Sequence, residues 1–335
     1  MSRAMKCGIG VAIGGLLYLG IGVADATSSD QEYNLTYKIK NGQKRKCTYE
    51  LSVAGEVKVI TFGRHPLMKF SSKVLRTIND EVLEASADAD GKTKTLKLKR
   101  EYASSVLTAL EPVNPSDNDA IKPGPEEKKE NTRPDAINKQ TIEISYQDGN
   151  VSIKPITATK STSASKQKDE LSEDVKALVT LHDGDFALFA PNKKVKVGDE
   201  WEVKSDVLAQ VLSLKDGRPI RYVHMSPEVG MRFDIHDSSV IKCTFEEVAQ
   251  VNNIECAKIK LGGQINAIED GMLKAEITLN GFIYLVIKDG TVHKVELDGE
   301  MKMNGEYPSK PTDKGVMLKC RVEGRGKMTL RLQAK

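Results

Sequence analysis

The chain has 335 residues, of which 50 are lysine or arginine and 47 are aspartate or glutamate, so its formal net charge is only +3. This balance argues against a protein that binds nucleic acid through its overall charge, and against a strongly acidic partner. The length is enough for one large β-rich domain or two small ones.

Residues 1–26 match the pattern of a secretory signal peptide. Arg3 and Lys6 give a basic start, an apolar, glycine-rich run extends from Cys7 to Val23, and Ala24-Asp25-Ala26 is a small-x-small cleavage triplet. An uncleaved anchor is the alternative, but the apolar run is short for a membrane span. We therefore predict an exported protein, periplasmic or extracellular, whose residues 27–335 form a single β-rich domain.

Alternation of apolar and polar residues predicts strands at the start of this domain. Two alternating runs flank Lys40-Asn41-Gly42 and predict a hairpin: Tyr33, Leu35, Tyr37 and Ile39 before the turn, and Cys47, Tyr49, Leu51 and Val53 after it. Residues 74–87 fit either a helix or a strand that pairs with residues 93–98 across Asp90-Gly91. We favour the strand, because Asp-Gly is a strong hairpin signal.

Two polar stretches predict flexible, solvated insertions. Residues 112–138 are rich in Pro, Lys, Glu, Asn and Asp, and residues 157–168 are rich in Thr, Ser and Lys. Between them, Asp148-Gly149 predicts a hairpin with a two-residue loop. That loop length pairs Tyr146 with Val151 and Ile144 with Ile153, so the apolar sides match.

Two short helices are predicted next. The first has an apolar stripe made of Leu171, Val175, Leu178 and Val179. The second follows Ser205, a good N-cap, and its apolar side holds Val207, Leu208, Val211 and Leu212. Between them lies Trp201, the only tryptophan, which we expect to cover the edge of the core beside a tight turn at Gly198-Asp199.

The stretch from Ile254 to Leu332 shows the longest alternation in the chain. From Ala257 to Met303 the apolar side chains of the predicted buried face fall at odd positions, and after the Pro308–Pro311 loop they fall at even positions. This predicts long antiparallel strands with one buried face, and the glycines at 262–263, 281, 299 and 324–326 predict bends in them. At Asp289-Gly290 a three-residue loop, with Gly290 in the left-handed conformation, pairs Leu285 with His293 and Ile283 with Val295. Phe282, Tyr284 and Val286 predict local cover, by a helix, of the other face.

The cysteines and histidines indicate no catalytic or metal site. Cys243 is predicted to point inward and Cys256 outward, which argues against a disulfide between them; a five-residue loop at 249–253 would put Cys243 opposite Ile259. Cys47 and Cys320 both point inward and could form a bridge if the sheet closes; small buried hydrophobic residues are the alternative. A hydrolase would need His182, His224 or His236 beside a carboxylate in a cleft. We expect no cofactor, no metal ion and no enzymatic activity.

A row of basic residues lies on the outer face of the last predicted strand: Lys319, Arg321, Arg325, Lys327 and Arg331. Such a row can contact anionic lipid or polysaccharide of the cell envelope. The alternative is a solvated strand face whose charges oppose edge-to-edge aggregation.

The segment Lys196-Val197-Gly198-Asp199-Glu200-Trp201-Glu202, the hairpin through Cys256-Ala257-Lys258-Ile259 and the glycine-punctuated strands up to Gly305 resemble a group of uncharacterised exported bacterial proteins. Their strand-rich bodies look like the half-barrel of the lipoprotein-localisation carriers LolA and LolB, in which a curved antiparallel sheet holds lipid around a helix. The resemblance covers about a third of the chain, and no functional residue of the group can be matched here.

Together these patterns predict a mainly β protein, a strongly curved antiparallel sheet or half-barrel with two short helices. The function we expect is non-enzymatic binding of an apolar or amphipathic, lipid-like ligand in the concavity of the sheet. The alternative is a structural or cell-envelope interaction module with a filled core, which contacts partners through the basic outer strand.

Overall fold

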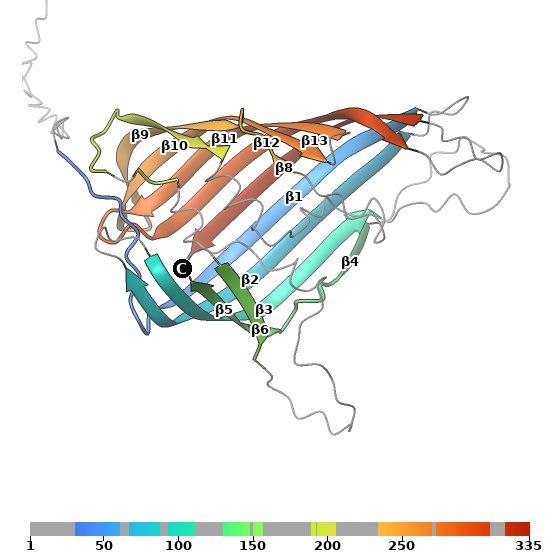
Figure 1. The fold of residues 1–335 in the computed structure, drawn as a ribbon. Coiled ribbons are helices and arrows are strands. Elements are labelled where there is room, and N and C mark those ends of the chain that lie inside the picture. The colour runs from blue at the N-terminus through green and yellow to red at the C-terminus, as the bar shows by residue number, and fades with distance from the viewer. Residues whose placement is uncertain are drawn as a thin grey trace, which may run out of the picture.

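The computed structural model describes residues 31–60, 67–87, 93–110, 130–147, 150–156, 189–191, 193–205, 234–269, 273–308 and 319–335. These residues form one 13-stranded antiparallel sheet (Figure 1). The strands are β1 (Lys44–Ile60), β2 (Leu67–Ala87), β3 (Thr93–Leu110), β4 (Glu130–Pro134), β5 (Thr141–Gln147), β6 (Asn150–Pro155), β7 (Glu200–Lys204), β8 (Asp234–Ile235), β9 (Val240–Val251), β10 (Ile254–Glu269), β11 (Leu273–Val286), β12 (Val292–Pro308) and β13 (Lys319–Ala334).

The first and last strands pair with each other in the middle of the sheet. The strand order is β6-β5-β3-β2-β1-β13-β12-β11-β10-β9-β7, with β4 on β3 and β8 on β10. Cys47 lies opposite Ala334, and the pairing continues to Ile60 opposite Arg321. The two ends of this path, β6 and β7, therefore come from the middle of the sequence, and the two halves of the sheet meet at a contact between residues almost three hundred positions apart.

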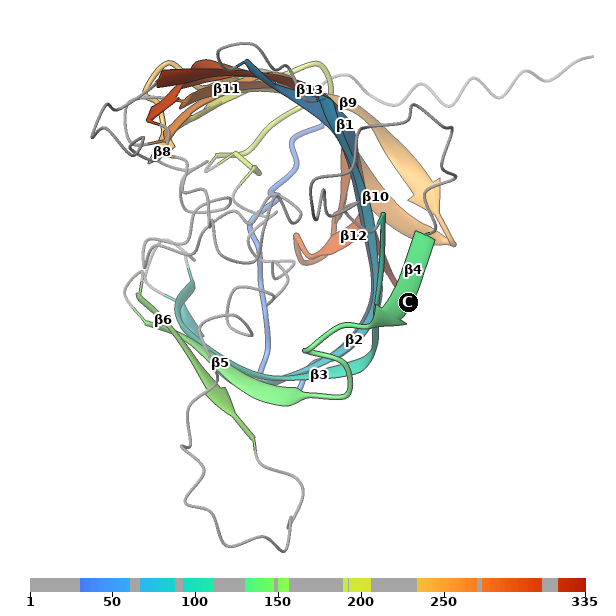
Figure 2. The same ribbon diagram turned by 90° about the vertical axis from the view of Figure 1, so that its right-hand side faces the viewer.

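The sheet curls strongly around its inner side (Figure 2). Register shifts at Thr77/Ile78, Val82/Glu84 and Ser86/Ala87 on β2, and at Tyr284/Leu285 on β11, add bulges that increase twist and bending. The N-terminal segment 31–43 crosses the inner side in Figure 2, and its Leu35 is fully buried within the main hydrophobic cluster. The core therefore lies on the concave face, which we call the inner face; the convex side is the outer face.

The predicted alternation is confirmed along the long strands. On β12, Val295, Leu297, Met301 and Met303 are buried, while Asp298, Glu300 and Lys302 between them are exposed. The strand interpretation of residues 74–87 is correct, since they belong to β2. The pairing of Tyr146 with Val151 and of Ile144 with Ile153 is confirmed as well.

The predicted first hairpin is wrong. Residues 33–39 form no strand beside β1; both sides of β1 are occupied, by β2 and by β13. Tyr33 instead makes an isolated antiparallel bridge with Val195. The turn at Lys40-Asn41-Gly42 does occur, with Gly42 at φ 77° and a hydrogen bond from Gln43 N to the Lys40 carbonyl oxygen.

Three further expectations need correction. The solvated insertion predicted at 112–138 ends earlier, because Glu130–Pro134 is strand β4 on β3 and Ile137 is fully buried. Cys243 lies opposite Leu261, not Ile259. The reasons are a two-residue turn between β9 and β10, in which Asn252 and Asn253 both have positive φ, and a register shift between Lys258 and Ile259. Ile283 pairs with Val295 as predicted, but the bulge at Tyr284/Leu285 places Leu285 opposite Val292.

Several expectations lie outside the described residues. These are the signal peptide at 1–26, the polar stretch 157–168 and both helices, of which only Ser205 is described. The described part of the chain contains no helix that is long and apolar enough to cross a membrane.

Candidate functional site

The inner face is the strongest candidate site, because it gathers the apolar side chains of strands from both halves of the chain. Side chains directly opposite one another form rows across the sheet. One row, all buried, runs through Tyr49, Leu332, Val295, Ile283 and Ile259. Rows of this kind place large apolar residues near the end of the sheet that segment 31–43 crosses.

The opposite end of the inner face is built from smaller residues and methionines. A row close to that end runs through Val57, Gly324, Met303, Ala275 and Ala267. Large apolar side chains therefore line one end of the inner face, and small residues and methionines line the other.

Three methionines on the inner face each lie opposite a glycine of the neighbouring strand. Met301, Met303 and Met328 face Gly326, Gly324 and Gly299 across the β12–β13 pair. A Cβ on Gly324 would come within 2.8 Å of Met303 Cε, and one on Gly299 within 3.3 Å of Met328 Cε. The thioether chains thus occupy space that the glycines leave open, and because methionine is unbranched it can rearrange around a ligand of irregular shape.

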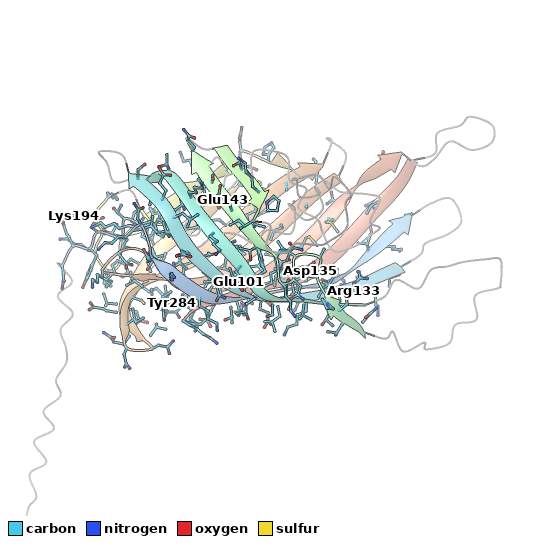
Figure 3. The ribbon with its side chains drawn as sticks, turned by 90° about the horizontal axis from the view of Figure 1, so that it is seen from below. Glu101, Arg133, Asp135, Glu143, Lys194 and Tyr284 are labelled. Atoms are coloured by element: carbon cyan, nitrogen blue, oxygen red, sulfur yellow. The ribbon has the colours of Figure 1, made fainter. Side chains whose placement is uncertain are left out.

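A buried polar cluster interrupts the apolar lining on β2 and β3. Arg76 donates from Nε to Ser105 Oγ at 3.0 Å and from Nη2 to Asp135 Oδ2 at 2.7 Å. Asp135 lies in the connection between β4 and β5, and Asn138 of the same connection accepts a hydrogen bond from Ser105 N at 2.8 Å. The two side chains of the Arg76–Asp135 pair are each only 6% exposed. This pair therefore fastens the β4–β5 connection to the sheet, and Figure 3 labels Asp135 there.

A second ion pair lies next to the first. Arg100 binds Asp80 in a bidentate manner, Nε to Oδ1 and Nη2 to Oδ2, both at 2.8 Å. Both guanidinium groups approach the ring of Tyr102, at 5.8 Å for Arg76 and 6.0 Å for Arg100. Burial raises the pKa of the nearby Tyr49 phenol to about 12, although Arg76 acts in the opposite direction. The tyrosine is therefore neutral at physiological pH.

Sequence reasoning missed this cluster, although a signal was present. Arg76, Asp80 and Arg100 occupy even positions, as do the buried Ile78, Val82 and Leu98 on the same strands. Their side chains are therefore expected on the same, inner face. A charged residue at an inward position of a strand needs a partner, so this parity indicates buried ion pairs.

The outer face carries many charges that pair across strands, with exposed leucines at 67, 75 and 83 of β2 among them. Examples are Glu50–Lys73 at 2.9 Å, Glu56–Arg325 at 2.7 Å and Lys97–Glu143 at 3.1 Å. Figure 3 shows this side from below, with Glu101 and Glu143 labelled on β3 and β5. Cross-strand pairs of this kind suit a sheet surface in contact with water.

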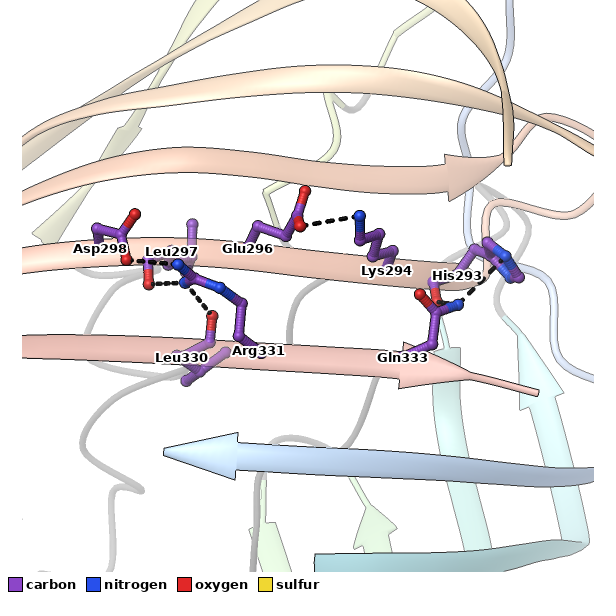
Figure 4. A network of polar contacts seen from close by, with 8 residues as sticks. All are labelled: His293, Lys294, Glu296, Leu297, Asp298, Leu330, Arg331 and Gln333. Carbon is purple, nitrogen blue, oxygen red and sulfur yellow. Dashed lines mark hydrogen bonds and ion pairs between the residues drawn. The ribbon is translucent and has the colours of Figure 1, made fainter. Parts of the chain in front are cut away.

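The predicted basic row lies on the outer face of β13, among carboxylates. Arg325 pairs with Glu56, Arg321 with Glu323 at 2.9 Å, and Lys327 approaches Glu300 to 4.0 Å. Arg331 is held more firmly: it bonds Asp298 at 2.7 Å and the backbone oxygens of Leu297 and Leu330 (Figure 4). Lys319 is at the first position of β13, and its side chain lies outside the described part. Arg325 and Lys327 keep the most solvent contact, with side chains 80% and 81% exposed.

The outer aromatic residues of β11 contact lysines of the neighbouring strands. Lys258 Nζ lies 4.7 Å from the centre of the Phe282 ring, and Lys294 Nζ lies 5.3 Å from that of Tyr284. The helix predicted to cover these rings lies outside the described residues, and the lysine chains already shield them in part.

The described cysteines are free thiols. Cys243 and Cys256 are buried, and their predicted lack of a disulfide is confirmed. Cys47 is free as well, so it does not bridge to Cys320. The reason is antiparallel pairing: Cys47 lies opposite Ala334, whereas Cys320 is at the far end of β13.

The described histidines form no catalytic constellation. His236 is exposed and contacts Ser238, His293 is buried beside Gln333, and His182 and His224 lie outside the described part. Within the described ranges, no group of three or more His, Cys, Asp and Glu side chains is arranged to hold a metal ion.

No protein-family model matches the chain, and no curated protein matches it either. Among solved structures, the chain is similar to an outer membrane channel from Pseudomonas putida F1, with 8% sequence identity and a TM-score of 0.20 over 90% of this chain and 98% of that chain. It is also similar to a Pseudomonas aeruginosa FadL homologue, with 8% identity and a TM-score of 0.14 over 87% of this chain and 90% of the other. At these TM-scores the likeness does not establish a shared fold.

Proposed function

We propose that the protein is a non-enzymatic, exported protein that binds an apolar or amphipathic, lipid-like ligand against the inner face of its curved sheet. The observation that supports this most is the division of polarity between the two faces of the same strands. On β12 the inward residues Val295, Leu297, Met301 and Met303 are apolar, and the outward residues are charged. A sheet with a charged convex side and an apolar concave side suits a ligand that avoids water.

The composition of the inner face favours a ligand with a flexible apolar part. The methionines opposite glycines on β12 and β13 give an adaptable apolar surface. The polar groups of Arg76, Ser105 and Asp135 on the same face are buried and bonded to one another. The surface that remains suits the acyl-like chain of a ligand.

Mass spectrometry and a binding assay test this proposal together. Native mass spectrometry after gentle extraction should detect a co-purifying lipid, and the purified protein should take up a fluorescent fatty acid. Met303→Lys places a charge on the inner face and should weaken uptake by about tenfold or more. Lys302→Glu, one position along the same strand on the outer face, is the matched control and should leave uptake unchanged. Absence of both lipid and uptake in the unmutated protein would contradict the proposal.

Attachment to an anionic envelope surface is a second candidate function. The supporting observation is the high exposure of Arg325 and Lys327 beside Arg321 on the outer face of β13. Reversing these three charges should abolish retention on anionic lipid vesicles at low salt. Reversal of Lys44, Lys73 and Lys99, which lie on the outer faces of β1, β2 and β3, is the control. Equal retention of both variants would remove this candidate.

Export is part of both functions. The purified mature protein should begin close to residue 27, as the triplet Ala24-Asp25-Ala26 predicts. N-terminal sequencing of protein from the periplasm or medium checks this, and retention of the full leader on cytoplasmic protein would contradict it.

A further inference from the structure

Segment 31–43 crosses one end of the curled sheet without joining it as a strand. In Figure 1 it lies at the end where β13 finishes, and in Figure 2 it crosses the inside of the curve from the β9 side to the β2–β3 side. In the strand order, β9 and β2 are separated by β10, β11, β12, β13 and β1. The segment therefore links parts of the sheet that are far apart along its width.

At its beginning the segment is attached beside β9. Tyr33 N donates to the Val195 carbonyl oxygen at 2.7 Å, and Val195 N donates back to the Tyr33 carbonyl oxygen at 3.0 Å. The Tyr33 ring also meets Phe245 of β9 edge to face, with ring centres 5.4 Å apart. Leu35, two residues later, is fully buried. This attachment combines a small β-bridge with an apolar anchor.

In its middle the segment lies on the turn between β11 and β12. Lys38 N donates to the Asp289 carbonyl oxygen at 2.8 Å. Gly290, in the left-handed conformation at φ 66°, is packed so closely that a Cβ would come within 2.4 Å of the Thr36 carbonyl oxygen. Glycine is therefore required at 290 both by its own backbone and by the segment that lies over it.

At its end the segment is attached to β2. Gly42 N donates to the Val82 carbonyl oxygen at 2.8 Å, and Val82 N donates to the Gln43 carbonyl oxygen at 2.9 Å. The side chain of Asn41 accepts a hydrogen bond from Ala85 N at 2.6 Å. The segment is thus held at three separate places, each by only one to three hydrogen bonds.

We propose that residues 31–43 are a strap that holds the two sides of the curled sheet together, and that its release from the Gly290 turn opens this end of the inner face for ligand exchange. The strap part of the inference is independent of the proposed function, and the exchange part rests on it. A segment with few hydrogen bonds and one main apolar anchor can open locally at a lower free energy than global unfolding. Opening at Gly290 would leave the strands paired, since their ladders do not include the strap.

The test compares two glycines. Gly290→Ala introduces a methyl group that collides with the strap, whereas Gly198→Ala, outside the strap, introduces the same residue at a positive φ of 93° with nothing within 4 Å of the added Cβ. Both variants carry the same kind of backbone strain, so their difference reports on the strap. Lys38→Pro, which removes the N–H that donates to Asp289, serves as a second strap variant in case Gly290→Ala does not fold.

Two measurements are made on each variant. Amide hydrogen exchange of Tyr33 and Lys38 should be about tenfold faster in Gly290→Ala than in Gly198→Ala, while exchange in β12 stays unchanged. Dissociation of the fluorescent fatty acid should be faster by a similar factor in Gly290→Ala. Unchanged exchange at Tyr33 and Lys38 would overturn the strap, and faster exchange with an unchanged dissociation rate would overturn its role in ligand exchange. If the unmutated protein binds no fatty acid, the proposed function fails, but the hydrogen-exchange result still decides the strap.

Discussion

The backbone of Gly281 on β11 lies directly against the carbonyl group of Glu296 on β12. A Cβ at Gly281 would come within 2.0 Å of the Glu296 carbonyl oxygen, and the φ of Gly281 is 149°. Gly324, by contrast, leaves room that is filled by the end of the Met303 side chain, 2.8 Å from where its Cβ would stand. Glycine thus occupies these two positions of the inner face for different reasons. At 281 a neighbouring backbone leaves no room for a Cβ, and at 324 the space is taken by a side chain that can move.

We predict that Gly281→Ala is strongly destabilising and Gly324→Ala only mildly so. The first substitution forces two backbones apart and should lower the free energy of unfolding by about 3 kcal/mol. The second needs a rotation of Met303 and a small shift of Val57, whose Cγ2 would lie 3.3 Å from the added Cβ, and should cost about 1 kcal/mol. Urea unfolding followed by circular dichroism measures both values. Similar losses in the two variants would contradict the assignment of these contacts.

Arg100 and Asp80 should matter to stability because each charge is the buried partner of the other. Removing one should cost far more than replacing both. Asp80→Asn removes the charge from the bidentate partner of a guanidinium that is 1% exposed, and should cost about 3–5 kcal/mol. The double variant Asp80→Asn/Arg100→Met replaces the buried cation by an apolar side chain and should recover most of that loss. Chemical denaturation of the two single variants and the double variant gives the coupling energy. A double variant less stable than Asp80→Asn alone would contradict this account.

Much of the sheet could be predicted because alternation reports directly on extended backbone with one buried face. The parity of residues 257–303 and the pairing around Asp148-Gly149 follow from it, and both are confirmed. Alternation does not identify the partner of an extended segment, however. Tyr33, Leu35, Tyr37 and Ile39 alternate because Leu35 is buried while the segment crosses the inner face, and not because it pairs with β1.

The features that the sequence did not predict are pairings between distant strands and buried residues within a polar segment. The β1–β13 contact joins the two ends of the described chain, and no local pattern indicates it. Residues 130–138 are polar in composition, yet Asp135 and Ile137 are buried, because one binds Arg76 and the other lies in the core. The methionine–glycine contacts depend on the exact register between β12 and β13. Alternation does not fix that register, because a shift of two residues keeps every side chain on the same face.

The described cysteines should be unreactive in the folded protein. Burial raises the pKa of Cys243 to about 12 and that of Cys47 and Cys256 to about 11. Thiolates are the reactive species, so at pH 8 these thiols should react with a thiol reagent far more slowly than in the denatured protein. Absorbance assays on a mature Cys320→Ser variant, with and without guanidinium chloride, isolate the three residues. Rapid reaction without denaturant would contradict the burial of Cys243 and Cys256 and the raised pKa of the half-buried Cys47.

His293 should make the protein less stable at mildly acidic pH. Its pKa is lowered from the ordinary value of 6.5, mainly because the ring is buried and further because Arg45 and Lys294 are nearby. The unfolded chain therefore takes up a proton at a higher pH than the folded protein does. The stability that His293 contributes is complete above pH 6.5 and is lost as the pH falls through 6.5 toward the folded-state pKa. The urea midpoint should thus decrease between pH 8 and pH 5, and by a smaller amount in His293→Gln, which has no titrating group at this position. Other titrating groups contribute equally to both proteins, so the difference between them isolates the histidine; an identical decrease in both would show that His293 is protonated as readily in the folded state as in the unfolded chain.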